Sequence, residues 1–139
     1  MENTLNENNK DKMYILIQCK HFTITIGKDI LRNLGFPTHI CFRVNSASNS
    51  FIILPCKAED AMSFKVPDDI YLNHHTIMRI RSKAFLSHII ETNNFDSELV
   101  YSYGAHFIKE KNTVLVNLLP ENLRRVSTLD RMKVEMPVG

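Results

Sequence analysis

Alternation of apolar and polar residues near the start of the chain predicts two β-strands. Segment 22–26 places one phenylalanine and two isoleucines on one face and two threonines on the other. A period of two residues is typical of a half-buried strand. The apolar segment 13–19 before it is also rich in residues that favour strands. Because Lys20 and His21 alone separate the two segments, we predict a β-hairpin.

In two places the apolar spacing changes to that of a helix. The first predicted helix begins after Gly27 and ends at Gly35, a length of about two turns. The second covers 83–92, where apolar residues form one stripe and Ser82 is a suitable N-cap. Because a helix of two turns is not stable alone, its apolar residues are expected to pack into a core.

The remaining apolar and alternating segments predict six more strands, at 39–44, 51–54, 64–66, 76–81, 99–107 and 113–119. Polar turn residues separate them, as in Asn45-Ser-Ala-Ser-Asn-Ser50. After Pro120 the chain contains Leu123-Arg-Arg-Val126. This last segment is either a short helix packed on the sheets or a frayed arm, and we favour the helix.

The order strand, strand, helix, strand, strand occurs twice along the chain, with helix starts at Lys28 and Lys83. The predicted parts are a disordered tail, a first unit, an acidic linker with a short strand, a second unit and a C-terminal tail: 1–12, 13–57, 58–75, 76–120 and 121–139. A unit of about 45 residues is too small to bury both faces of its hairpins. We therefore expect a mainly β (α+β) fold, in which the tandem β-β-α-β-β units form one β-barrel pseudo-dimer, either monomeric or paired again as a homodimer.

Composition agrees with one small globular protein, since 44% of the 139 residues are hydrophobic and 23% are charged. No apolar run approaches the roughly 20 residues of a membrane span, and the first residues lack the pattern of a signal peptide. Three widely spaced cysteines (Cys19, Cys41 and Cys56) are an odd number, which favours a reduced, cytoplasmic protein. We expect no membrane contact.

The net charge of +2 is small, but the positive charge is unevenly distributed. Segment 13–57 carries five Lys or Arg residues against Asp29 alone, whereas segment 58–75 is acidic. Motifs of enzymes or cofactor sites are lacking: four glycines cannot form a phosphate loop, and Ser82 beside Lys83 has poor geometry for a nucleophile and its base. The adjacent His74 and His75 would point to opposite sides of an extended chain. We predict no enzyme activity, no cofactor and no metal.

Three stretches together resemble the AbrB/SpoVT family: Ile24-Thr-Ile-Gly-Lys-Asp-Ile-Leu-Arg-Asn-Leu-Gly35, then Ile40-Cys-Phe-Arg-Val44, and Phe51-Ile-Ile-Leu-Pro55. The resemblance covers about 13–57, and a fainter copy covers 64–120. It implies a swapped-hairpin barrel and a small transcriptional regulator that binds double-stranded DNA. In the family, arginines on the first strand, the second strand and the short helix contact DNA.

The family's positions, together with the basic residues of the second unit, give six candidate DNA-binding residues: Lys20, Lys28, Arg32, Arg79, Arg81 and Lys83. Arg79 and Arg81 would share one strand face, about 7 Å apart, close to the spacing of successive phosphates. An alternative is a non-enzymatic accessory protein of a phage or another mobile element, which binds a protein partner or a small ligand. A third interpretation is an antitoxin that binds its partner through 123–136.

Overall fold

The computed structural model describes residues 13–72 and 77–128, and within these ranges it contains two five-stranded antiparallel sheets and two α-helices. The fold is therefore mainly β with a smaller helical part, in agreement with the predicted class. Some features of the sequence lie outside the described residues: the predicted disordered tail 1–12, the His74-His75 pair and the end of the chain from residue 129.

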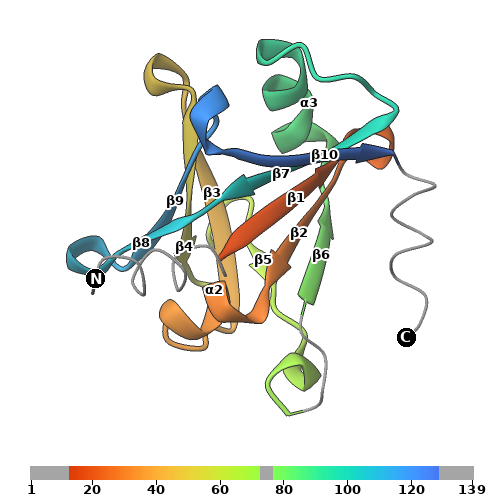
Figure 1. Ribbon diagram of the computed structural model, residues 1–139. Helices are drawn as coiled ribbons and strands as arrows, with labels where there is room; N and C mark the ends of the chain where they lie inside the picture. Colours follow the sequence, from red (N-terminus) through yellow and green to blue (C-terminus); the bar gives the residue numbers. More distant parts are fainter. Residues whose placement is uncertain (1–12, 73–76, 129–139) are drawn as a thin grey trace, which may run out of the picture.

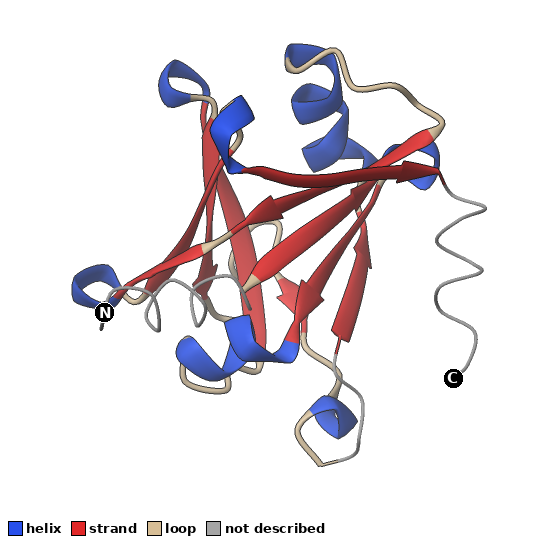
Figure 2. Cartoon of the chain, viewed as in Figure 1, coloured by secondary structure: helices blue, strands red, loops and turns tan. Residues whose placement is uncertain are grey.

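Five strands pair in the order β10-β7-β1-β2-β6 and form the sheet that we call sheet A (Figure 1). In that order they are Leu123–Thr128, Leu99–Gly104, Tyr14–Gln18, Thr23–Gly27 and Ile77–Arg81. Sheet B has the order β5-β3-β4-β9-β8. Its strands are Phe64–Lys65, His39–Asn45, Ser50–Pro55, Thr113–Asn117 and His106–Ile108. The helices α2 (Lys28–Asn33) and α3 (Lys83–Thr92) lie at opposite ends of the pair of sheets (Figures 1 and 2).

The predicted hairpin near the start of the chain is confirmed, because β1 pairs antiparallel with β2. Its turn, like those between β3 and β4 and between β8 and β9, is one 3-10 turn followed by a left-handed residue. That residue is Phe22 in the first hairpin (φ 50°), Asn49 in the second (φ 52°) and Asn112 in the third (φ 48°). Asparagine tolerates this backbone conformation better than a bulky side chain does. The three hairpins thus use one turn geometry with unequal residue choices.

Both helices end in the same motif, although their sequences differ there. In α2 the amide of Phe36 donates to the carbonyl of Leu31, at 3.0 Å, and Gly35 has a φ of 89°. In α3 the amide of Phe95 donates to the carbonyl of Ile90, at 3.0 Å, and Asn94 has a positive φ. These are Schellman caps, which glycine or asparagine favours. The predicted helix end at Gly35 and the predicted N-cap Ser82, whose Oγ accepts from the amide of Phe85, are both confirmed.

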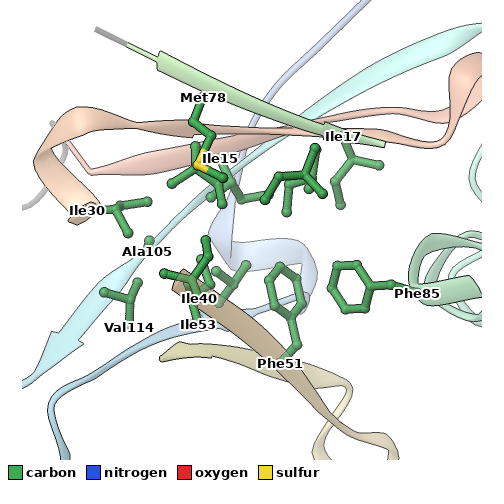
Figure 3. Close-up of a cluster of buried hydrophobic side chains, with 14 of the residues drawn as sticks. Ile15, Ile17, Ile30, Ile40, Phe51, Ile53, Met78, Phe85, Ala105 and Val114 are labelled. Atoms are coloured by element: carbon green, nitrogen blue, oxygen red, sulfur yellow. The ribbon is translucent and has the colours of Figure 1, made fainter. Parts of the chain in front are cut away.

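The core lies between the inner faces of the two sheets, and Figure 3 shows the side chains that meet there. Sheet A contributes the alternating isoleucines of β1 and β2, all of which are fully buried: Ile15, Ile17, Ile24 and Ile26. Sheet B contributes fully buried side chains from β3, β4 and β9, among them Ile40, Phe51, Ile53 and Val114. No buried side-chain nitrogen or oxygen in the described ranges lacks a hydrogen-bond partner. The inner faces are thus a dry apolar layer, and the outer faces are where polar chemistry can occur.

The two segments 23–55 and 77–117 follow the same order of elements, strand, helix, strand and hairpin. They meet through equivalent strands: β2 pairs with β6, and β4 pairs with β9. One difference is that β3 is continuous, whereas its counterpart is divided at Ala105 into β7 of sheet A and β8 of sheet B. The predicted single strand 99–107 is therefore two strands joined by a corner.

The prediction of a helix in the C-terminal segment is wrong for the described part, because 123–128 form β10 at the edge of sheet A. Isolated apolar residues suggested a helix face, but the segment is too short for a stable helix and contains valine and threonine, which favour strands. The free edge of β7 supplies the backbone partners. This correction moves Arg124 and Arg125 onto sheet A.

Candidate nucleic-acid interface

The outer face of sheet A carries one row of side chains that crosses all five strands. The pairing of neighbouring strands aligns, in order, Arg125, Ser102, Leu16, Thr25 and Arg79. The two arginines stand on the edge strands β10 and β6, and the short or apolar side chains stand between them. Since neighbouring strands are about 4.8 Å apart, the two edge positions are separated by roughly 19 Å along the sheet.

A hollow of about 690 Å³ lies over this row. Its floor is made of small or apolar residues that are nearly inaccessible, with exposed fractions of 8% for Thr25, 3% for Ser102 and 2% for Val100. Long cationic side chains stand at its margins: Lys28 and Arg32 on α2, Arg79 on β6, and Arg124 and Arg125 on β10. Asp29 is the acidic residue among the described lining residues. The concave face is therefore strongly positive.

At the α2 margin the sequence places Lys28 and Arg32 one turn apart. Arg32 is held by Asp29, whose Oδ1 accepts from Nη1 at 2.6 Å, but both side chains remain about half exposed. An exposed ion pair of this type contributes little stability because water screens it. Lys28 is in the first helical turn, where the helix dipole slightly disfavours a cation. An anion over the hollow would relieve that repulsion.

At the β10 margin an aromatic ring contacts one of the two arginines. The guanidinium carbon of Arg124 lies 4.4 Å from the centre of the Tyr14 ring, a cation–π contact that fixes the side chain beside the hollow. Arg125 is in the cross-strand row and is exposed. Sequence reasoning missed both arginines as candidates because it assigned their segment to a helix. The signal was present in Val126-Ser-Thr128, a run that favours a strand.

The structure brings three of the six predicted residues, Lys28, Arg32 and Arg79, to the hollow. Arg81 is exposed on the same face of β6, one row beyond Arg79, as the alternation predicted.

The other two predicted residues lie near the first hairpin turn, which precedes β2. Lys20 Nζ is 3.8 Å from Glu98 Oε1, and Lys83 Nζ lies 5.7 Å from the centre of the Phe22 ring. The predicted set therefore divides into a group of four residues beside the outer face of sheet A, two on α2 and two on β6, and a pair at the end of the sheet.

Two cysteine thiols have pKa values that keep them protonated at neutral pH. Burial, reinforced by the negative charge of Asp96, raises the pKa of Cys19 to about 12. Burial and the neighbouring Cys41 thiol raise the pKa of Cys56 to about 11. Because the thiolate is the reactive form of cysteine, neither group has the character of an activated nucleophile.

Two further features of the described residues bear on the class of site. Within 13–72 and 77–128, no group of three or more His, Cys, Asp or Glu residues is arranged to hold a metal ion. Nor does any helix in these ranges have the length and apolar character needed to cross a membrane. Comparison of the chain with protein-family models, curated proteins and solved structures found no match.

Proposed function

We propose that this protein is an AbrB-like DNA-binding transcriptional regulator that holds duplex DNA by its phosphates on the outer face of sheet A. The observation that carries the proposal is the hollow of sheet A, where cations from α2, β6 and β10 surround a floor of small side chains. The contact residues are Lys28, Arg32, Arg79, Arg81, Arg124 and Arg125. Segments that are far apart in sequence supply them, so the fold itself assembles the charge.

The shape of this face suits a convex polyanion. A floor of serine, threonine, valine and the half-buried Leu16 has no long, exposed side chain that would keep a duplex away, while the arginines at both edges reach toward the two sides of a body about 19 Å wide. Arginine also forms paired hydrogen bonds to phosphate oxygens. Lys20 and Lys83, which lie at the end of the sheet, would extend the contact along the DNA.

We also propose how the two halves of the chain are arranged. The pairing of β2 with β6 and of β4 with β9 supports a swapped-hairpin-like β-barrel in which two tandem units form a pseudo-dimer. In such a barrel the two units would share one face, which is why a chain with a small net charge can still present a concentrated positive surface.

The test is direct binding of the purified chain to a fluorescent DNA duplex of about 20 base pairs at two salt concentrations. If four to six phosphates are contacted, the affinity falls by about 10²- to 10³-fold between 50 and 200 mM salt. Affinity weaker than the non-specific range, or an affinity that does not change with salt, contradicts the proposal. A duplex of unrelated sequence, measured in parallel, shows how far the affinity depends on the DNA sequence.

A second candidate is an accessory protein that binds a small anionic ligand, and the size of the hollow favours it. Its volume of about 690 Å³ falls within the range of roughly 300–1,000 Å³ that is common for small-ligand sites. Inorganic tripolyphosphate distinguishes the two candidates. A rise in melting temperature with tripolyphosphate, together with no binding of duplex DNA, would favour the small ligand.

A further inference from the structure

The two similar halves of the fold differ at one position. One half has a full strand there, and the other half lacks it. Strand β1 lies between β2 and β7 and pairs antiparallel with both. It thereby connects the strand that precedes α2 with the strand that follows α3. Four residues of β1, from Ile15 to Gln18, pair with both neighbours.

The equivalent position lies between β6, which precedes α3, and β3, which follows α2. Here the chain supplies β5, which has two residues and pairs with β3 at His39 and Ile40 alone. Within 13–72 and 77–128, no pairing joins β6 to β5 or to β3, so β6 is the last strand of sheet A. Among the described residues, the side of β3 that pairs with β5 has no strand partner from Cys41 to Asn45.

Contacts on both sides of β6 keep it near β3. Before β6, the hydroxyl of Tyr71 donates to the carbonyl of Pro37 at 2.8 Å. After β6, Phe85 in the first turn of α3 stacks on Phe42 of β3, with ring centres 4.4 Å apart. The two strands therefore border one space, which we call the seam between β3 and β6. Strand β5 fills one end of it.

The side chains along this seam have a definite chemical character. Phe42 and Phe64 pack against the core but stay partly exposed, and Val44, which alternates with Phe42, is 42% exposed. On the outer side, Arg43 of β3 and the two arginines of β6 are exposed. No hydrogen bond or ion pair links these three arginines to another described residue. The seam thus has an apolar inner side and a cationic outer side.

We propose that the seam between β3 and β6 binds an extended acidic peptide segment of a partner protein, which adds a strand antiparallel to both. The peptide would occupy the position that β1 fills in the other half. Its backbone would pair with the free edges of β6 and β3, as in other cases of strand addition. Apolar side chains at alternate positions would cover Phe42 and Val44, and aspartate or glutamate at the positions between would face Arg43, Arg79 and Arg81.

The occupant is a partner rather than a second copy because of charge. The strands of this chain that border the seam carry arginines on their outer side, so two copies would place like charges across the new pairing, which is destabilising. An acidic strand would instead place opposite charges across the same pairing, which is stabilising.

The experiment uses the full chain and a fluorescein-labelled nonapeptide in which glutamate and valine alternate. Controls are a peptide with lysine in place of glutamate and one in which two central residues are proline. Anisotropy is expected to show binding of the acidic peptide at least 10-fold tighter than either control. Hydrogen exchange should slow at alternate amides of 77–81 and 41–45 when the peptide is present.

A pair of variants separates this site from the DNA site. Arg43→Glu lies on sheet B and should weaken peptide binding about 5- to 10-fold while leaving DNA affinity within twofold. Arg125→Glu, on β10, should weaken DNA binding and leave the peptide unaffected. The proposal is overturned if the acidic peptide binds no better than the controls, or if exchange slows at β10 instead. It is equally overturned if the alternate amides of 77–81 that point away from β2 are already protected in the free chain, since a tail or a second copy would then fill the seam.

Discussion

Both sheets are five-stranded and antiparallel, but the chemistry of their outer faces is very different. Across sheet A the central row ends in arginine at both edges and has Ser102, Leu16 and Thr25 between them. The corresponding row of sheet B contains Arg43, Ile52, Leu115 and His106. One face is a basic hollow, and the other is an apolar strip with one arginine at its edge. The fold determines the position of each side chain, and the residue types at those positions determine what each face can bind.

The largest effect is expected from reversing the charge of both edge arginines of sheet A. In the double variant Arg79→Glu/Arg125→Glu, we expect DNA affinity at 50 mM salt to fall by about 100-fold or more and the salt slope to decrease by about two. The cause is the loss of two phosphate contacts and the addition of two repulsive charges. Anisotropy titrations at several salt concentrations measure both quantities. Arg43→Glu is the matched control on sheet B, and a similar loss there would mean that the binding face is not sheet A.

A charge in the middle of each row sharpens the same comparison. Leu16→Glu places a carboxylate on the floor of the hollow, and Leu115→Glu places one within the row of sheet B, on β9, where leucine is also half-buried. We expect Leu16→Glu to weaken DNA binding about 10-fold, because the carboxylate repels phosphate and neutralises a neighbouring arginine. Leu115→Glu should leave binding within twofold. Far-ultraviolet circular dichroism confirms that both variants are folded, and equal losses in the two would argue for an unspecific effect.

The thiols give a comparison that depends on pH. Cys19 belongs to the turn next to sheet A, and its pKa is raised from 9.0 to about 12, mainly by burial. The folded protein therefore binds this proton more tightly than the unfolded chain, so its contribution to stability is complete below pH 9 and is lost between about pH 9 and 12. The slope reaches at most about 1.4 kcal/mol per pH unit. Urea unfolding at pH 8, 9 and 10 should show a smaller pH-dependent decrease for Cys19→Ala than for the parent chain.

Cys56, near sheet B, is the control for that experiment. It is less buried, and its pKa rises to about 11. Because both folded pKa values lie well above the unfolded value of 9.0, Cys56→Ala and Cys19→Ala should flatten the pH dependence almost equally between pH 8 and 10, and the two variants should differ only above about pH 11. An unchanged pH dependence in Cys19→Ala would show that other groups, such as the buried Tyr103 whose pKa is also raised, account for the loss.

Sequence patterns predicted most strands and both helices because each depends on local alternation, spacing or caps. The hairpin at Lys20 and His21, the cap at Ser82 and the end at Gly35 are examples. What they could not predict is which strands pair across the molecule. The position of Arg125 beside Ser102, and of Arg79 beside Thr25, depends on non-local register. Arg32 and Arg79 were found as candidates one by one, but their meeting with β10 at one hollow is a property of the folded chain.

The smallest effect concerns the hairpin turns, where sheets A and B use different residues for the same backbone. Asn112 closes the β8–β9 turn of sheet B at a φ of 48°. We expect Asn112→Ala to lower the free energy of unfolding by about 1 kcal/mol, because the Cβ of either residue meets the carbonyl oxygen in this conformation and alanine lacks the polar side chain by which asparagine offsets that cost. Asn112→Gly should leave stability nearly unchanged, since glycine adopts positive φ freely but costs more chain entropy on folding. Urea denaturation measures both variants.

The β1–β2 turn of sheet A has Phe22 at the same position, and its ring also packs on the core. Packing and turn preference therefore oppose each other in sheet A, whereas Asn112 is exposed and reports turn preference alone. If alanine and glycine at 112 were equally stable, the residue differences between the two turns would have no conformational cause.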